Sequence, residues 1–91
     1  MADPVDQYRI TRHASFEMQR RGISESVVRR VLLAPEQRYS IREGRDVLQS
    51  RIAFARKLYL VRVFVDLDRE PPEVVTIYRT SRIAKYWRAE A

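Results

Sequence analysis

The sequence has no cysteine, one histidine and two glycines among its 91 residues. Without cysteine the chain can form neither disulfides nor thiolate metal sites. A single imidazole also argues against a zinc or iron site built on histidines. We therefore expect neither a metal nor a cofactor.

Long apolar runs are also missing, since none approaches the roughly 20 residues that a membrane-spanning helix needs. The N-terminal stretch MADPVDQYRI is acidic and contains no apolar segment of the kind found in signal peptides. We expect a cytoplasmic protein with no membrane partner. The length fits one domain, for which we expect residues 8–88, after a flexible N-terminal tail over residues 1–7.

Lysine is scarce in a chain that is otherwise basic. Lys57 and Lys85 are the only lysines among 18 basic residues, and the formal net charge is +6. Arginine is favoured where a planar side chain contacts phosphate or carboxylate through two hydrogen bonds. The composition therefore predicts nucleic acid or an acidic protein as the partner. The alternative is an arginine bias imposed by a GC-rich genome.

A short strand over residues 7–10 and two helices are predicted for the first third of the chain. Thr11 offers the N-cap of a helix over residues 13–21, and Gly22 stands where helices end in the left-handed region. Ser24 offers the N-cap of the second helix.

The hydrophobic period then changes to two, which predicts an antiparallel meander of four strands over residues 37–42, 45–55, 58–66 and 73–79. A short helix is expected over residues 81–88. The predicted fold class is α+β: a short strand, a two-helix hairpin packed on one face of the four-stranded meander, and a short C-terminal helix.

Arg62 interrupts the apolar pattern of residues 58–66, although an arginine in a central strand is almost never buried without a partner. If Arg56 and Lys57 form a two-residue hairpin loop, Arg51 lies opposite Arg62. The neighbouring registers place Tyr78 opposite Arg62 and an arginine of the second strand opposite Gln49. One face then carries Arg38, Arg51, Arg62, Thr76 and Tyr78.

Like charges that face each other destabilise a sheet, so this predicted face indicates an anion, such as a phosphodiester, bound between the arginines. The alternative is a salt-bridge network, because Glu36 lies near Arg51 in this register. The strand over residues 73–79 is followed by a second basic and aromatic group, formed by Arg79, Arg82, Lys85 and Tyr86. That group is either a binding surface or a solvated helix.

His13 opens the first helix, where the positive end of the helix dipole favours neutral imidazole and so suits a general acid or base. The alternative is a histidine that caps or packs locally. Residues 13–33 also match a helix-turn-helix motif weakly, since Arg21 falls where that motif buries an apolar side chain and no third helix follows.

The order strand, two helices, four-strand meander and short tail, with arginine and aromatic residues on the open face of the sheet, resembles the RelE/ParE-like toxin superfamily. Three short motifs are similar to an uncharacterised bacterial branch near the BrnT toxins. They are His13-Ala14, Arg21-Gly22-Ile23-Ser24 and Val75-Thr76-Ile77-Tyr78. The resemblance covers about residues 8–86.

The resemblance implies a RelE-like fold and a small toxin that is neutralised by a cognate antitoxin and that cleaves mRNA without metal. RelE-like members keep basic residues on central strands, an arginine at the end of the last strand and often a tyrosine in the terminal helix. Arg51 and Arg62, Arg79 and Tyr86 stand at those places here. The lysine-rich stretch of ribosome-dependent members is missing, and a histidine at the position of His13 is not a feature of RelE itself.

We therefore expect the toxin of a bacterial type II toxin–antitoxin pair, acting as an endoribonuclease in which the RNA 2′-hydroxyl attacks the adjacent phosphate. Its partners would be the cognate antitoxin and RNA, free or on the ribosome. The candidate catalytic residues are His13, Arg51, Arg62, Tyr78, Arg79 and Tyr86. The candidate nucleic-acid-binding residues are Arg38, Arg82 and Lys85. The alternatives are a non-catalytic basic module that binds RNA or a partner, and a ParE-like gyrase poison.

Overall fold

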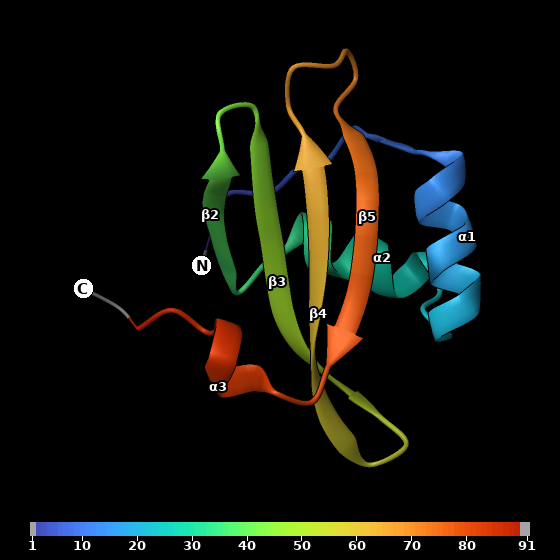
Figure 1. Ribbon diagram of the computed structural model, residues 1–91, viewed down its shortest axis with the longest axis vertical. Coiled ribbons are helices and arrows are strands. Elements are labelled where there is room, and N and C mark those ends of the chain that lie inside the picture. Colours follow the sequence, from blue (N-terminus) through green and yellow to red (C-terminus); the bar gives the residue numbers. More distant parts are fainter. Residues whose placement is uncertain (1, 90–91) are drawn as a thin grey trace.

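A mixed sheet of five strands forms the centre of the computed structural model, which describes residues 2–89 (Figure 1). Four strands are antiparallel neighbours in chain order: β2 (Gln37–Arg42), β3 (Arg45–Phe54), β4 (Lys57–Asp66) and β5 (Glu73–Thr80). The strand β1 (Arg9–Ile10) pairs in parallel with the beginning of β5. The predicted α+β class is confirmed, and the predicted meander is the larger part of a mixed sheet in the order β1-β5-β4-β3-β2.

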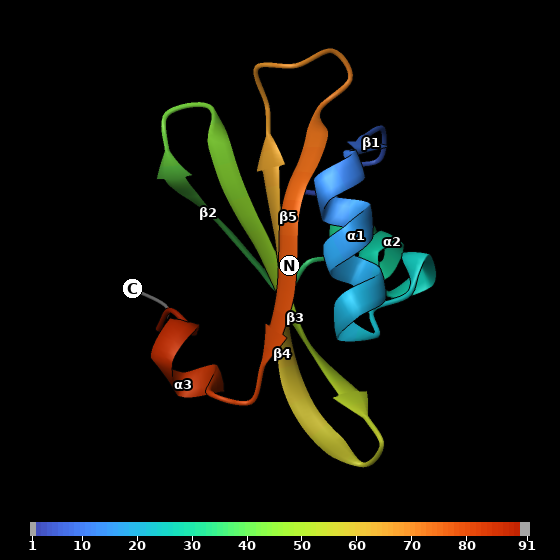
Figure 2. The ribbon, with the colours of Figure 1, turned by 45° about the vertical axis from the view of Figure 1, so that its right-hand side comes forward.

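The helices α1 (Arg12–Arg21) and α2 (Glu25–Leu33) cover one face of the sheet (Figure 2). Both predicted caps are confirmed: Thr11 accepts a hydrogen bond from the Ala14 amide and Ser24 accepts one from the Val27 amide. Gly22 ends α1 at φ 65°, in the left-handed region that glycine tolerates best. No helix within residues 2–89 is long and apolar enough to cross a membrane.

The core lies between these two helices and the sheet. Residues of α2, namely Val28, Val31 and Leu32, and strand residues of the covered face are fully buried there; the strand residues include Leu48, Val61, Val63 and Ile77. Residues 2–7, for which we expected a flexible tail, contribute Val5 to this core, and the Val5 amide donates to the Leu32 carbonyl at 2.8 Å. The sheet face opposite α1 and α2, here called the open face, carries the short helix α3 (Ile83–Tyr86) at one end (Figure 2).

The hairpin between β3 and β4 turns one residue earlier than predicted, at Ala55 and Arg56. Arg62 therefore faces Gln49, and Arg51 faces Leu60, so the predicted Arg51–Arg62 pair is wrong. A physical reason is the packing of Phe54, which in the observed register contacts the ring of Tyr59 edge-on with 5.6 Å between centroids.

A register shift between Ser40 and Arg42 marks a bulge in β2, which was not predicted. Because side chains alternate along a strand, the extra residue moves every residue before it to the other face. Arg38 therefore lies opposite Leu48 on the face of α1 and α2, and its predicted place opposite Gln49 is wrong. Gln37 and Tyr39 occupy the open face instead. The predicted pair of Arg62 and Tyr78 is confirmed.

Stability should fall in acid because ion pairs lower the pKa of three carboxyl groups, those of Glu17, Glu36 and Asp66. Hydrogen bonds from Arg45 lower the pKa of Asp66, and hydrogen bonds from Arg51 lower that of Glu36. A carboxyl whose pKa is lower in the folded state stabilises it above the unfolded pKa of about 4, and this contribution is lost as the pH falls through the folded value. We expect the urea midpoint, followed by circular dichroism, to drop below about pH 4. Asp66→Asn should make that drop shallower, and a midpoint constant into strong acid would contradict the prediction.

Candidate functional site

The side chain of Arg62 lies at the centre of the open face, and only 5% of the residue is exposed. Its guanidinium donates three hydrogen bonds to neutral groups on three different strands. Nε donates to Oε1 of Gln49 at 2.8 Å, Nη1 to the hydroxyl of Tyr78 at 2.7 Å, and Nη2 to the hydroxyl of Tyr39 at 2.7 Å. The register of β2 to β5 thus surrounds one positive charge with neutral hydrogen-bond acceptors.

Three aromatic rings also lie around the guanidinium. Together with the hydrogen-bonded residues they form what we call the Arg62 cluster: Arg62, Tyr39, Gln49, Phe64, Tyr78 and Tyr86. The guanidinium carbon lies 4.4 Å from the ring centre of Tyr86, 5.2 Å from that of Phe64 and 5.8 Å from that of Tyr78. Cation–π contacts of this kind contribute about 0.5–2 kcal/mol each.

No carboxylate within residues 2–89 forms a salt bridge with Arg62. Burying a charged side chain without a counter-ion costs several kcal/mol, even after the protein relaxes around it. The hydrogen bonds and the rings offset part of that cost, but they leave the positive charge in place. The arrangement is therefore suited to attract an anion to the open face.

The two phenol groups that accept hydrogen bonds from Arg62 differ in where their own protons go. The Tyr39 hydroxyl donates to the main-chain carbonyl of Tyr86 at 3.4 Å. The Tyr78 hydroxyl interacts instead with the side chain of Tyr86. Burial raises the pKa of Tyr78 and a hydrogen bond between the two phenols contributes to raising it, although the hydrogen bond from Arg62 opposes part of this rise. Tyr78 therefore keeps its proton at neutral pH and can donate it to a ligand.

Gln49 links the cluster to the C-terminal segment. It is fully buried, and its Nε2 donates to Oε1 of Gln37 at 2.7 Å and to the carbonyl of Tyr86 at 3.2 Å. Sequence reasoning assigned no role to Gln49, Tyr39 or Phe64. Gln49 carried little signal, because two polar residues follow it directly and the predicted register placed Arg51, not Gln49, opposite Arg62.

Arg51 shares the open face but is neutralised, as the alternative interpretation of the sequence held. Its Nε and Nη2 donate to the two oxygens of Glu36 at 3.1 and 2.9 Å, and its amide donates to the same carboxylate. The ring of Trp87 lies 4.3 Å from its guanidinium carbon. Arg38, on the other face, is likewise paired, with Asp46 at 2.8 Å.

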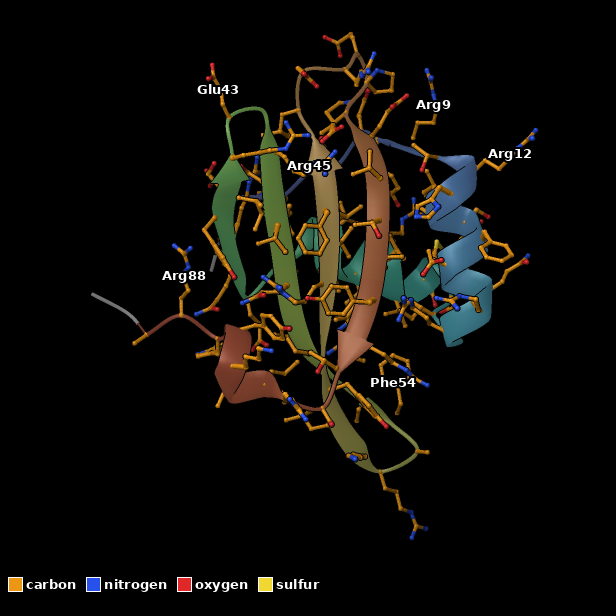
Figure 3. All side chains as sticks on the ribbon, in the orientation of Figure 1. Arg9, Arg12, Glu43, Arg45, Phe54 and Arg88 are labelled. Atoms are coloured by element: carbon orange, nitrogen blue, oxygen red, sulfur yellow. The ribbon has the colours of Figure 1, made fainter. Side chains whose placement is uncertain are left out.

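Arg79 points away from the Arg62 cluster, because it follows Tyr78 in β5 and neighbouring side chains of a strand alternate between faces. Its guanidinium carbon lies 4.3 Å from the ring centre of Phe54 and 4.8 Å from that of Tyr59. Figure 3 shows Phe54 beside the end of β5. Lys85 lies exposed near the ring of Tyr86.

Arg82 is exposed at the N-cap of α3, the helix that contains Tyr86, and makes no side-chain capping bond. His13 is exposed in the first turn of α1, which packs against β5 on the covered face. The structure thus brings Arg62, Tyr78 and Tyr86 together, while His13 and Arg79 lie on the other side of the sheet. In the described part of the chain no group of three or more His, Asp or Glu residues could hold a metal ion.

A family model described as "Domain of unknown function (DUF4258)" matches residues 10–79. The matched stretch contains all residues of the Arg62 cluster except Tyr86. Comparisons with curated proteins and with solved structures give no match.

Proposed function

The chain belongs to the DUF4258 family, and from that premise we propose that it is the cytoplasmic toxin of a bacterial type II toxin–antitoxin pair. In this proposal it binds mRNA on the open face, cleaves it without metal, and is neutralised by a cognate antitoxin. The observation that carries the proposal is the buried charge of Arg62, which has no carboxylate partner within residues 2–89. The order of strands and helices supports kinship with the RelE/ParE-like toxins, since it follows the order that the resemblance implies.

The chemistry follows from the two groups that meet at 2.7 Å, Arg62 Nη1 and the Tyr78 hydroxyl. The RNA 2′-hydroxyl attacks the adjacent phosphorus in line, the bond from phosphorus to the 5′-oxygen breaks, and a 2′,3′-cyclic phosphate and a 5′-hydroxyl are formed. Tyr78 donates its proton to the departing 5′-oxygen. Arg62 stabilises the phenolate left on Tyr78, and its charge stabilises the extra negative charge of the transition state.

The proton of the 2′-hydroxyl passes to water, because no histidine or carboxylate hydrogen-bonds to the Arg62 cluster within residues 2–89. The same observation favours a second candidate function, in which the cluster binds RNA or an acidic partner without catalysis. The bound phosphate or carboxylate would then accept a hydrogen bond from the Tyr78 hydroxyl.

The nature of the RNA ends separates these two functions. We expect purified protein in the presence of EDTA to cut RNA and to leave 2′,3′-cyclic phosphates, which mass spectrometry identifies from the product masses. RNA that is bound but stays intact would contradict cleavage and support the non-catalytic function. Cleavage that stops in EDTA would contradict the metal-independent mechanism.

A further inference from the structure

The β3–β4 hairpin ends in a strained turn. Ala55 and Arg56 have φ values of 49° and 72°, in the left-handed region that residues with a Cβ adopt at a cost in stability. Two-residue turns with positive φ at both positions favour Asn-Gly or Gly-Gly for this reason. The hairpin projects beyond the rest of the sheet (Figure 1). Arg56 thus stands at an exposed tip whose backbone is strained at both central positions of the turn.

Three cations gather on this hairpin and at the end of the strand beside it. Arg56 and Lys57 are exposed, and neither they nor Arg79 forms a salt bridge within residues 2–89. Arg79 is ordered by its contacts with the rings of Phe54 and Tyr59. We call Arg56, Lys57 and Arg79 the basic hairpin.

Arg79 is prepared to bind a phosphate. Its guanidinium is packed against two rings, and its N–H groups form no hydrogen bond within the described residues. A guanidinium held in this way loses little further freedom when it forms a two-pronged contact with a phosphate.

The basic hairpin and the Arg62 cluster can be reached by one continuous strand of RNA. Tyr78 and Arg79 are consecutive residues on opposite faces of β5, and β1 pairs with β5 only at Glu73 and Val74. In the described chain no strand therefore covers the edge of β5 beside Tyr78 and Arg79. A polyanion that lies on Tyr78 can pass around this edge and meet the hairpin.

We propose that the basic hairpin binds the phosphate backbone of single-stranded RNA flanking the phosphate held at the Arg62 cluster. The assignment to RNA rests on the proposed function. It concerns binding alone, because the three cations lie outside the Arg62 cluster and take no part in bond cleavage.

The test measures binding of a 2′-O-methyl RNA oligonucleotide, which cannot be cleaved by 2′-hydroxyl attack, at several salt concentrations. Arg56→Gly removes one phosphate contact and relieves the strain at its position. We expect the slope of log affinity against log salt to become smaller by about 0.7, and the affinity at about 0.15 M salt to fall about fourfold. The melting temperature should rise, because glycine adopts positive φ freely.

Ala55→Gly is the matched control, since it relieves strain at the neighbouring position and leaves every charge in place. We expect a higher melting temperature with unchanged affinity and salt slope. A second variant, Arg79→Gln, should also reduce the slope by about 0.7 and does not depend on the turn.

Unchanged slopes for Arg56→Gly and Arg79→Gln would overturn the proposal, as would an equal loss of affinity in Ala55→Gly. Binding of polyglutamate in place of the oligonucleotide, with the same dependence on Arg56 and Arg79, would assign the surface to acidic polypeptides and also overturn it. Hairpin-dependent binding by a protein that leaves unmodified RNA intact would refute the proposed cleavage but support the basic hairpin.

Discussion

Arg62→Met is expected to lower RNA cleavage about 100- to 1,000-fold, the usual loss of rate when one preorganised group that stabilises developing charge is removed. The melting temperature of this variant should stay equal or rise. Methionine fills a similar volume without charge. Replacing a buried charge with an apolar side chain is often neutral or stabilising, because the desolvation cost of the charge disappears. Arg62 is 5% exposed and lacks an acidic partner within residues 2–89, so this relief should offset the loss of the hydrogen bond that its Nε donates to the buried Oε1 of Gln49.

The measurement pairs initial cleavage rates with thermal unfolding of the same preparations. Arg51→Met is the matched control, since Arg51 also lies on the open face but pairs with Glu36 in a partly exposed salt bridge. Such pairs contribute about 0–1 kcal/mol, so the control should keep most of its stability and of its cleavage rate. If Arg62→Met melts far lower while its activity per folded molecule is unchanged, Arg62 is a structural residue.

The positions of most elements were predictable because their signals are local. Thr11, Gly22 and Ser24 delimit the helices through hydrogen bonds and a backbone conformation that depend on one residue each. Strand β2 was predicted with its observed bounds from alternation alone. The parallel pairing of β1 was not predicted, since its two residues carry no periodic signal and their partners, Glu73 and Val74, stand far along the chain.

The candidate site was predictable in part. A register error of two positions leaves a side chain on the same face of the sheet, whereas an error of one position moves it to the other face. Turning β3 into β4 one residue early moved Arg51 away from Arg62 by two positions and kept it on the same face. The bulge in β2 changed parity, so Tyr39 replaced Arg38 beside Arg62. Nothing local in residues 37–42 distinguishes a bulged strand from a regular one.

Salt bridges separate the arginines of the predicted site into two groups that the sequence alone does not distinguish. Arg38 and Arg51 have carboxylate partners, whereas Arg62 and Arg79 have aromatic rings and no salt bridge within residues 2–89. A carboxylate neutralises the charge of an arginine, whereas an aromatic ring or a neutral hydrogen-bond acceptor leaves that charge in place. Of these four arginines, the two without a carboxylate partner within residues 2–89 are therefore the ones we assign to RNA.

Tyr78→Phe is expected to lower cleavage of ordinary RNA about 100- to 10,000-fold, the usual contribution of a positioned general acid. The variant keeps the ring that stacks on Phe64, with centroids 5.9 Å apart, and removes only the hydroxyl. A substrate whose 5′-bridging oxygen at the cut site is replaced by sulfur needs no proton donor, because a thiolate is a good leaving group. The variant should cleave that substrate at close to the wild-type rate.

Tyr39→Phe provides the control, because Tyr39 also accepts a 2.7 Å hydrogen bond from Arg62 but donates its own proton to the Tyr86 carbonyl. Loss of the Tyr39 hydroxyl should slow the cleavage of ordinary and of sulfur-containing RNA to the same degree.

The pH dependence of cleavage gives an independent check on the role of Tyr78. The pKa of Tyr78 is raised, so the proton donor is present below that value and is lost as the pH rises through it, above about pH 10. Wild-type cleavage should therefore show no decline caused by Tyr78 between about pH 6 and 9. If the sulfur substrate does not restore the Tyr78→Phe rate, Tyr78 binds the phosphate without transferring a proton, and the 5′-oxygen must receive its proton from water.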